Sequence, residues 1–241
     1  WVGLRDICDR YGIILVADET ITAFGRVGHW FASSLFDGRP DLITFAKGVT
    51  AGHAPLGGVL MTERMSAPFV TGGETYMHGL TYSGHPMTTA VADKVLEIYE
   101  RDEVFENVRE LAPHFEAGLQ ELRRIPLVGD VRGMGFFWAL EMVKDRQTKE
   151  LFDADEADWL LRSELSTHMD DLGLLCRLDD RGEPVIQLSP PLVSDAALLD
   201  RIVDIVGTAA DRAWTAWSGS RAATADPRSL PQRPQEKRGA A

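Results

Sequence analysis

The chain has 241 residues, 44% of them hydrophobic, and a formal net charge of −12. This composition supports a core large enough for one or two domains, and the acidic balance argues against nucleic acid or an anionic membrane as a partner. No apolar run in the sequence approaches the ~20 residues of a membrane span, and no signal peptide is visible. We therefore expect a cytoplasmic protein in which Cys8 and Cys176 remain reduced.

The N-terminal part of the sequence alternates a helical pattern with short apolar runs. Val2–Tyr11 has apolar residues at helical spacing, and Gly12 follows as a stop signal. The continuous apolar run 13–17 predicts a strand buried on both faces, and 42–46 and Gly58–Met61 predict two more strands. A helix followed by strands with short connections favours an α/β fold with a mostly parallel sheet.

The C-terminal part carries longer helical patterns and a second group of strands. The elements expected there are a helix opening at Pro86, a helix from Glu103 stopped by Pro126, a glycine-bent strand pair over 127–143, a helix over 155–172, a hairpin formed by 174–178 and 184–188, and a last helix capped by Ser194. We predict a large domain over 1–98, a small α+β domain over 99–217, and a disordered, apolar-poor tail over 218–241.

Two chemical groups follow the first two predicted strands. Asp18 follows the first strand, at the strand end where α/β sheets bind ligands, and its carboxylate could keep a pyridine nitrogen protonated. Lys47 follows the second strand and could form a Schiff base and shuttle a proton, provided that partial burial favours the neutral amine. The alternatives are a turn-capping aspartate and a surface lysine.

A polar, glycine-bearing loop precedes the helix that opens at Pro86. Residues 78–86 offer free N–H groups and hydroxyls next to a helix start, which suits an anion such as phosphate; the alternative is an ordinary N-capping loop. The six histidines do not cluster at metal-binding spacing, so we predict no metal site.

Several motifs together resemble class III pyridoxal-phosphate aminotransferases of the ω-transaminase type. The resemblance covers residues 1–217 and implies the α/β architecture of the pyridoxal-phosphate-dependent transferase fold type I. Because the family is close to twice as long, we expect an incomplete fold: part of the large, mainly parallel-sheet domain plus the C-terminal α+β small domain. The motifs, whose order and spacing match, are 15–26 with Asp18-Glu19-Thr20, 45–48 with Lys47-Gly48, the loop 78–86, the glycine-bent 128–135, and Ser189-Pro190-Pro191.

The resemblance assigns a role to each matching residue. Lys47 matches the catalytic Schiff-base lysine, and Asp18 matches the acid that binds the ring nitrogen. Thr20 stands where the family usually has valine against the ring face, so it is expected to contact the cofactor. Thr81 matches the threonine that reaches the phosphate of the neighbouring subunit's cofactor, which implies a homodimer with shared sites. Leu80, beside it, is expected to line the substrate pocket.

Arg177 carries the expectation about substrate. Its segment resembles the one that holds a mobile carboxylate-binding arginine in pyruvate-using ω-transaminases, and a guanidinium there could bind a keto acid through two hydrogen bonds. The alternative is a surface arginine paired with Asp179 or Asp180. Gln187 stands where the ornithine-type branch carries arginine, which argues against that branch.

The resemblance implies transamination: an amine or ω-amino acid gives its amino group to a keto acid, with pyruvate as the expected acceptor, through a Schiff base on Lys47 and pyridoxal 5'-phosphate. Two alternatives remain open. One is an aminomutase, racemase or decarboxylase on the same scaffold, and the other is a truncated, non-catalytic fragment that binds cofactor or dimerises. The phosphate loop and the ring-stacking aromatic residue are expected in a missing N-terminal part, so we expect this chain alone to be weakly active or inactive.

Overall fold

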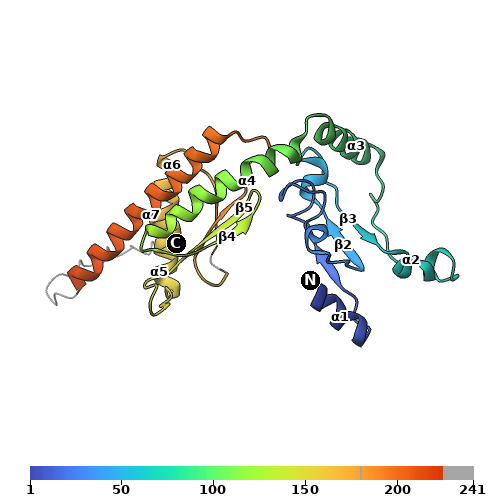
Figure 1. The fold of residues 1–241 in the computed structure, drawn as a ribbon, viewed down its shortest axis with the longest axis horizontal. Helices are drawn as coiled ribbons and strands as arrows, with labels where there is room; N and C mark the ends of the chain where they lie inside the picture. Colours follow the sequence, from blue (N-terminus) through green and yellow to red (C-terminus); the bar gives the residue numbers. More distant parts are fainter. Residues whose placement is uncertain (180, 225–241) are drawn as a thin grey trace, which may run out of the picture. The chain divides into compact units, whose positions relative to one another are not determined.

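The computed structural model describes residues 1–179 and 181–224 (Figure 1). They form two compact units, each made of several chain segments. Unit 1 comprises 1–120, 132–139 and 187–201, and unit 2 comprises 121–131, 140–186 and the described residues from 202 on. The domain boundary after residue 98 stays a prediction.

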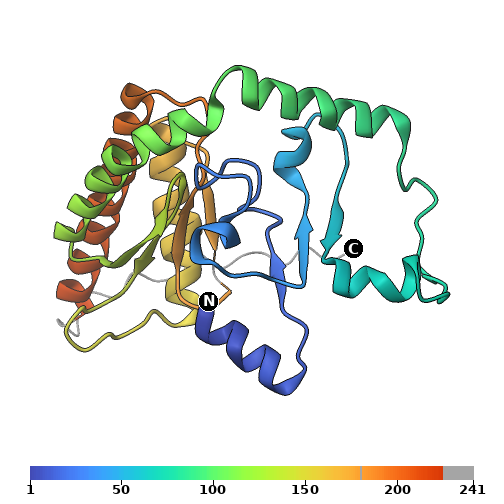
Figure 2. The same cartoon turned by 45° about the vertical axis from the view of Figure 1, so that its right-hand side comes forward.

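A three-stranded sheet lies at the centre of unit 1. Helix α1 (Val2–Tyr11) ends at Gly12 in the left-handed conformation, with φ 65°, as the sequence predicted. The strands that follow are β1 (Val16–Asp18), β2 (Leu42–Phe45) and β3 (Gly58–Met61), in the order β1-β2-β3. β1 and β2 are parallel, whereas β2 and β3 are antiparallel and lie side by side in Figures 1 and 2.

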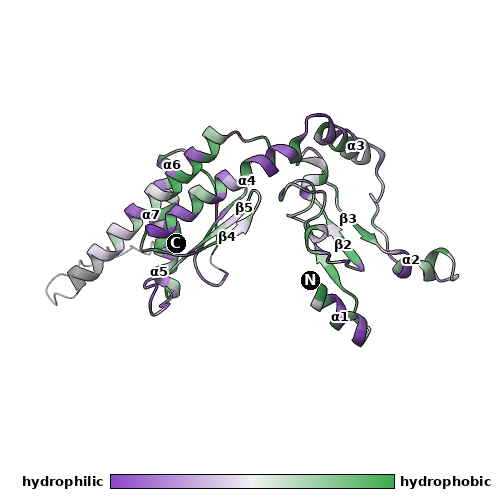
Figure 3. Ribbon diagram, viewed as in Figure 1, coloured by the Kyte–Doolittle hydropathy of each residue, from purple (hydrophilic) through white to green (hydrophobic). Residues whose placement is uncertain are grey.

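The first strand departs from its prediction. The sequence predicted a strand over 13–17 buried on both faces, but β1 begins at Val16, and several apolar residues of this run are half exposed. Ile13, Ile14 and Val16 are 51%, 49% and 49% exposed, whereas Leu15 and Ala17 are buried. Side chains alternate between the two faces of a strand, so only one face packs against the core of unit 1. The other face leaves apolar side chains open, as does β3, which Figure 3 draws mostly in the green of hydrophobic residues.

Short helical turns and three helices follow or interrupt these strands along the chain. Pro86 occupies the first turn of α3, where its missing N–H costs no hydrogen bond, and it confirms the predicted helix start. The elements of this part are the 3₁₀ turns η1 (Ala32–Phe36) and η2 (Lys47–Thr50) and the helices α2 (Glu63–Val70), α3 (Pro86–Arg101) and α4 (Val104–Glu121).

A second sheet has four strands in the order β4-β5-β7-β6, which confirms both the glycine-bent strand pair and the hairpin. The strands are β4 (Val128–Met134), β5 (Phe137–Met142), β6 (Arg177–Asp179) and β7 (Val185–Leu188). The helical elements of this part are η3 (Leu122–Arg124), α5 (Ala154–Asp158), the π-helical segment η4 (Trp159–Leu165), α6 (Ser166–Asp171) and α7 (Ala196–Thr224).

Two details of α7 differ from prediction. Its start is capped by Asp195, whose carboxylate accepts from Leu198 N at 2.8 Å, whereas the Ser194 hydroxyl donates back to the carbonyl of Pro191. The helix also extends to Thr224, through the first residues of the predicted tail, because alanines there favour helix. Residues 225–241 lie outside the described residues.

Candidate functional site

The register of the parallel strands brings Asp18 and Lys47 to the same edge of the unit 1 sheet. Asp18 is the last residue of β1 and lies opposite Thr44 of β2. Lys47 opens η2, two residues after β2 ends. Carboxyl ends of parallel strands meet at one edge, so a carboxylate and an amine distant in sequence come to the same sheet edge. The charge of Lys47 contributes to lowering the pKa of Asp18.

The backbone around Lys47 is held against the core of unit 1. Lys47 itself has a φ of 44°, an uncommon value for a residue other than glycine. A Cβ on the next residue, Gly48, would lie 2.9 Å from Cβ of Phe24, so glycine is required by close approach. The Tyr99 hydroxyl donates to the Gly48 carbonyl at 2.8 Å. The turn that carries the lysine is therefore fixed by packing and by a hydrogen bond from α3.

The Lys47 side chain is exposed, and this corrects the expectation of partial burial. The exposure of Lys47 has a local cause. Its left-handed backbone turns the chain into η2 directly after the three-stranded sheet. Within the described part of the chain, Lys47 makes no ion pair or side-chain hydrogen bond. Its amine is thus available for covalent chemistry.

Asp18 is held by one of its two carboxylate oxygens. Oδ1 accepts hydrogen bonds from Thr20 Oγ1 at 2.6 Å, from Thr44 Oγ1 at 2.9 Å and from Thr20 N at 3.1 Å. Donation from Thr20, followed by donation from Thr44, holds the pKa of Asp18 below its usual value, because hydrogen bonds to a carboxylate favour its charged form. The turn-capping role considered for Asp18 is present, and its side chain is exposed; its role toward a ring nitrogen stays a prediction.

The neighbouring carboxylate, Glu19, has a structural environment. Glu19 is 3% exposed, and its oxygens accept from Ala32 N at 2.6 Å, Ser33 N at 2.8 Å and Thr22 Oγ1 at 3.0 Å. These bonds fix the loop after β1 onto the start of η1. Of the adjacent carboxylates, Asp18 is therefore the one open to a ligand.

The loop that carries Leu80 and Thr81 is a separate, open feature of unit 1. Both side chains are exposed, Leu80 by 72%. Ser83 closes the turn, since its hydroxyl accepts from Leu80 N at 3.2 Å, and His85 Nδ1 accepts from Met87 N at the start of α3. Among the described residues, no hydrogen bond joins this loop to Asp18 or Lys47. The cofactor and substrate roles of Thr81 and Leu80 remain predictions.

Arg177, in unit 2, is paired with a carboxylate of its own strand. Its guanidinium donates to Asp179 Oδ2 at 2.9 Å, and Arg181 donates to the same oxygen at 2.6 Å. Hydrogen bonds from Arg181 and then Arg177 hold the pKa of Asp179 well below its usual range. The alternative role of Arg177, a surface ion pair, is present and involves Asp179. Asp180 lies outside the described residues.

Two residues of this site were missed by sequence reasoning. Thr44 carries a usable signal, because a polar residue opposite Asp18 in a parallel pair must reach the same sheet edge. Tyr99 carries none, since its contact with Gly48 joins residues 51 positions apart.

The arrangement fits a cofactor with a protonated pyridine nitrogen and an aldehyde carbon. Asp18 offers Oδ2, which accepts no hydrogen bond among the described residues, and Lys47 offers an unpaired amine. Within residues 1–179 and 181–224 no group of three or more His, Cys, Asp or Glu side chains could hold a metal ion. No helix in that part of the chain is long and apolar enough to cross a membrane.

Comparison with known proteins identifies the family. The sequence matches the aminotransferase class-III family over residues 1–209. It is 44% identical over 203 residues to a probable aminotransferase of Mycobacterium tuberculosis, covering 84% of this chain and 43% of that protein. It is 39% identical over 213 residues to the putrescine–pyruvate aminotransferase of Pseudomonas aeruginosa, covering 88% and 45% respectively.

A solved structure agrees with these matches. A PLP-bound mutant aminotransferase from Vibrio fluvialis superposes with a TM-score of 0.80 at 33% identity, covering 88% of this chain and 46% of that one. The fold predicted from the resemblance, the pyridoxal-phosphate-dependent fold type I, is thereby confirmed, and this chain spans less than half the length of the relatives it matches. The chain belongs to the class-III aminotransferases, whose cofactor is pyridoxal phosphate.

Proposed function

We propose that this chain carries the lysine and the ring-binding acid of a transaminase that moves an amino group from an amine donor to a keto acid. The observation that carries the proposal is the parallel register that places Asp18 and Lys47 at one sheet edge. Pyridoxal phosphate, when bound, supplies an aldehyde for covalent attachment and a ring that takes up electrons.

The residues of the chain divide the work by chemistry. Asp18, kept ionised by its hydrogen bonds, accepts a charge-assisted bond from the ring N–H. Lys47 would hold the cofactor covalently and, as a free amine, would carry a proton to and from the substrate carbon. Thr20 is proposed to contact the ring, and its position beside Asp18 supports this role. Thr81 is assigned to the phosphate of a partner subunit's cofactor, which makes the enzyme a homodimer with shared sites; a cytoplasmic location is proposed as well.

The acceptor is proposed to be pyruvate. Arg177 would bind the keto acid carboxylate through two hydrogen bonds after leaving Asp179, and Leu80 would contact the substrate. Support comes from the relative named putrescine–pyruvate aminotransferase. The exposed apolar residues of β1 and β3 further support coverage of the unit 1 sheet by additional protein in the assembled enzyme.

Cofactor binding tests the proposal at its centre. Pyridoxal phosphate is titrated into the chain, and the visible absorbance of the lysine-bound form is followed in the unaltered protein, Lys47→Ala and Lys94→Ala. Lys94 is a matched control, an exposed lysine paired with Glu97 at 2.6 Å. We expect the absorbance to vanish in Lys47→Ala and to persist in Lys94→Ala; absorbance that persists in Lys47→Ala would refute the assignment.

A product assay separates the proposal from its alternatives. With putrescine as donor, a protein containing this chain should form alanine from pyruvate and no alanine without the donor. With an amino acid in place of putrescine, a rearranged, epimerised or decarboxylated product formed without pyruvate consumption would favour the aminomutase, racemase or decarboxylase. Cofactor binding without any turnover would favour the non-catalytic fragment.

A further inference from the structure

The hydrogen bonds on Asp18 are distributed asymmetrically. Three donors converge on Oδ1, two from Thr20 and one from Thr44, at 2.6 to 3.1 Å. Among the described residues, Oδ2 accepts no hydrogen bond. A carboxylate that is ionised can accept on both oxygens, so one half of the acceptor capacity of Asp18 is occupied by the protein and the other half is left open.

The two threonines reach Oδ1 from different parts of the chain. Thr44 belongs to β2 and is placed opposite Asp18 by the strand register. Thr20 lies two residues after Asp18 and donates both its backbone N–H and its hydroxyl. Donors from two directions restrict rotation of the carboxylate plane, which a single local capping bond would not do. With Oδ1 fixed in this way, the position of Oδ2 is fixed as well.

We propose that Thr20 and Thr44 are positioning residues that clamp Oδ1 of Asp18 and present Oδ2 as the acceptor for a protonated ring nitrogen. The inference rests on the proposed cofactor role of Asp18. It also refines the expectation for Thr20: its hydroxyl is engaged with the acid, so contact with a ring is left to the rest of the side chain.

The clamp also has an electrostatic consequence. Donors on a carboxylate favour its charged form, and the charge of Lys47 acts in the same direction. Glu19, the neighbouring acid, is occupied by Ala32, Ser33 and Thr22. Loss of a threonine hydroxyl removes one donor to the Asp18 carboxylate and should therefore raise the proton affinity of Asp18.

The direct test measures Asp18 in the chain without cofactor. The carboxyl carbon signal of Asp18, identified by its loss in Asp18→Asn, is followed by NMR against pH in Thr20→Val and Thr44→Val. Valine keeps the β-branched shape and removes the hydroxyl. We expect the proton affinity of Asp18 to rise about threefold to tenfold in each variant and further in the double variant. Thermal unfolding checks that each variant remains folded.

Two matched variants make the test specific. Thr20→Ser keeps the hydroxyl and should titrate like the unaltered chain. Thr22→Val removes a hydroxyl in the same loop that donates to Glu19 rather than Asp18, at 3.0 Å, and should leave the Asp18 titration in place. Unchanged titration in both Thr20→Val and Thr44→Val, or an equal rise in Thr22→Val, would overturn the clamp.

A cofactor readout separates this inference from the proposed function. The dissociation constant of pyridoxal phosphate should rise about threefold to tenfold in Thr20→Val and recover in Thr20→Ser. A shifted Asp18 titration with unchanged cofactor affinity would overturn the positioning role. If Lys47→Ala bound the cofactor covalently and as tightly as the unaltered chain, the proposed function would be overturned. The carboxyl titration of Asp18 would then remain as the test of the clamp.

Discussion

The two sheets of this chain differ in how far the apolar residues in and near them are buried. In unit 2, Leu140 and Leu160 are completely buried. In the sheet of unit 1, Ile14 of the segment before β1 and Leu60 of β3 are 49% and 45% exposed. The apolar residues around the four-stranded sheet are thus well covered, whereas the three-stranded sheet, whose edge carries Asp18 and Lys47, presents apolar surface of the kind that marks a contact site. The chemistry lies at the less completely covered sheet.

Matched leucine truncations should show the largest difference between the units. Leu140→Ala in unit 2 leaves a cavity in a closed core and should cost about 2–5 kcal/mol of unfolding free energy. Leu60→Ala in unit 1 removes a half-exposed side chain and should cost under about 1 kcal/mol. Urea unfolding measures both, and equal losses would contradict the comparison.

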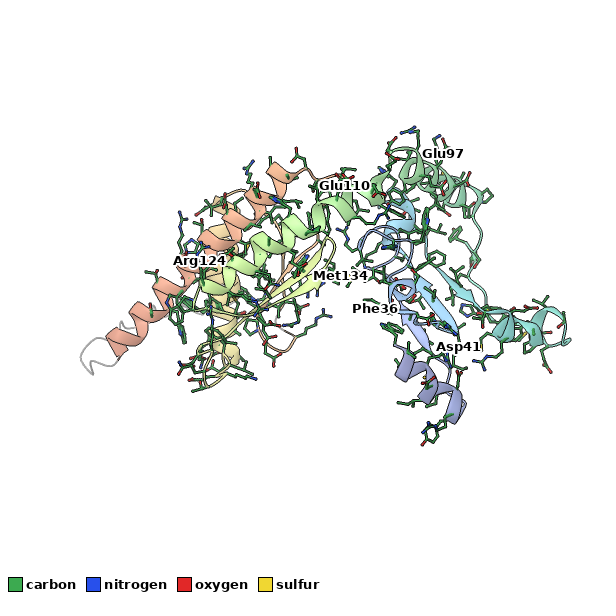
Figure 4. All side chains as sticks on the ribbon, in the orientation of Figure 1. Phe36, Asp41, Glu97, Glu110, Arg124 and Met134 are labelled. Carbon is green, nitrogen blue, oxygen red and sulfur yellow. The ribbon has the colours of Figure 1, made fainter. Side chains whose placement is uncertain are left out.

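Asp41 (labelled in Figure 4) should be the strongest polar anchor of unit 1. This carboxylate, 5% exposed, accepts from Leu15 N at 2.9 Å and Arg5 at 3.0 Å and pairs with Arg64. Asp41→Asn should cost about 2–3 kcal/mol, because charged hydrogen bonds are lost. Asp37→Asn, which breaks the exposed pair with Arg39, should leave the urea midpoint nearly unchanged. A similar loss in both would show that burial of Asp41 does not matter.

Arg177 should affect the keto acid and not the amine. In a protein containing this chain, Arg177→Ala should raise KM for pyruvate about tenfold, since a bidentate carboxylate bond is lost, with KM for the donor unchanged. Arg181→Ala is the control, because Arg181 shares Asp179 with Arg177. An equal effect of both substitutions on KM would mean that the pair only stabilises unit 2.

Acid should weaken unit 1 through Asp41. Its pKa is lowered to about 2, against burial, by Leu15 N and by the two arginines. A lowered folded-state pKa means that the stabilisation is complete above the unfolded value near 3.8 and is lost as the pH falls through about 2. Hydrogen exchange at about pH 5 and about pH 3 should show faster opening of β1 at the lower pH, and Asp41→Asn should remove that dependence.

Much of the fold was predictable because local signals agreed with it. Gly12 and Pro86 marked helix ends through backbone geometry. The burial of 13–17 was not predictable, because an apolar run does not reveal which strand face the rest of the chain covers. The cap of α7 shifted from Ser194 to Asp195 for a similar reason: both residue types cap helices, and only the fold selects one.

The positions of Asp18 and Lys47 at a strand end could be predicted from the sequence, but their surroundings could not. Asp18 and Lys47 follow apolar strands, and a parallel register brings such ends together. The exposure of Lys47 and the pairing of Arg177 with Asp179 depend on three-dimensional surroundings that strand patterns do not contain. Thr44 could have been found by aligning the two strands in register.

Chemical trapping tests the central claim, that Lys47 is the lysine that holds the cofactor. The chain is incubated with pyridoxal phosphate, reduced with borohydride so that the covalent bond becomes permanent, and digested for mass spectrometry. We predict the label on the peptide that contains Lys47. Label on Lys94, Lys144 or Lys149 with Lys47 unmodified would contradict the account.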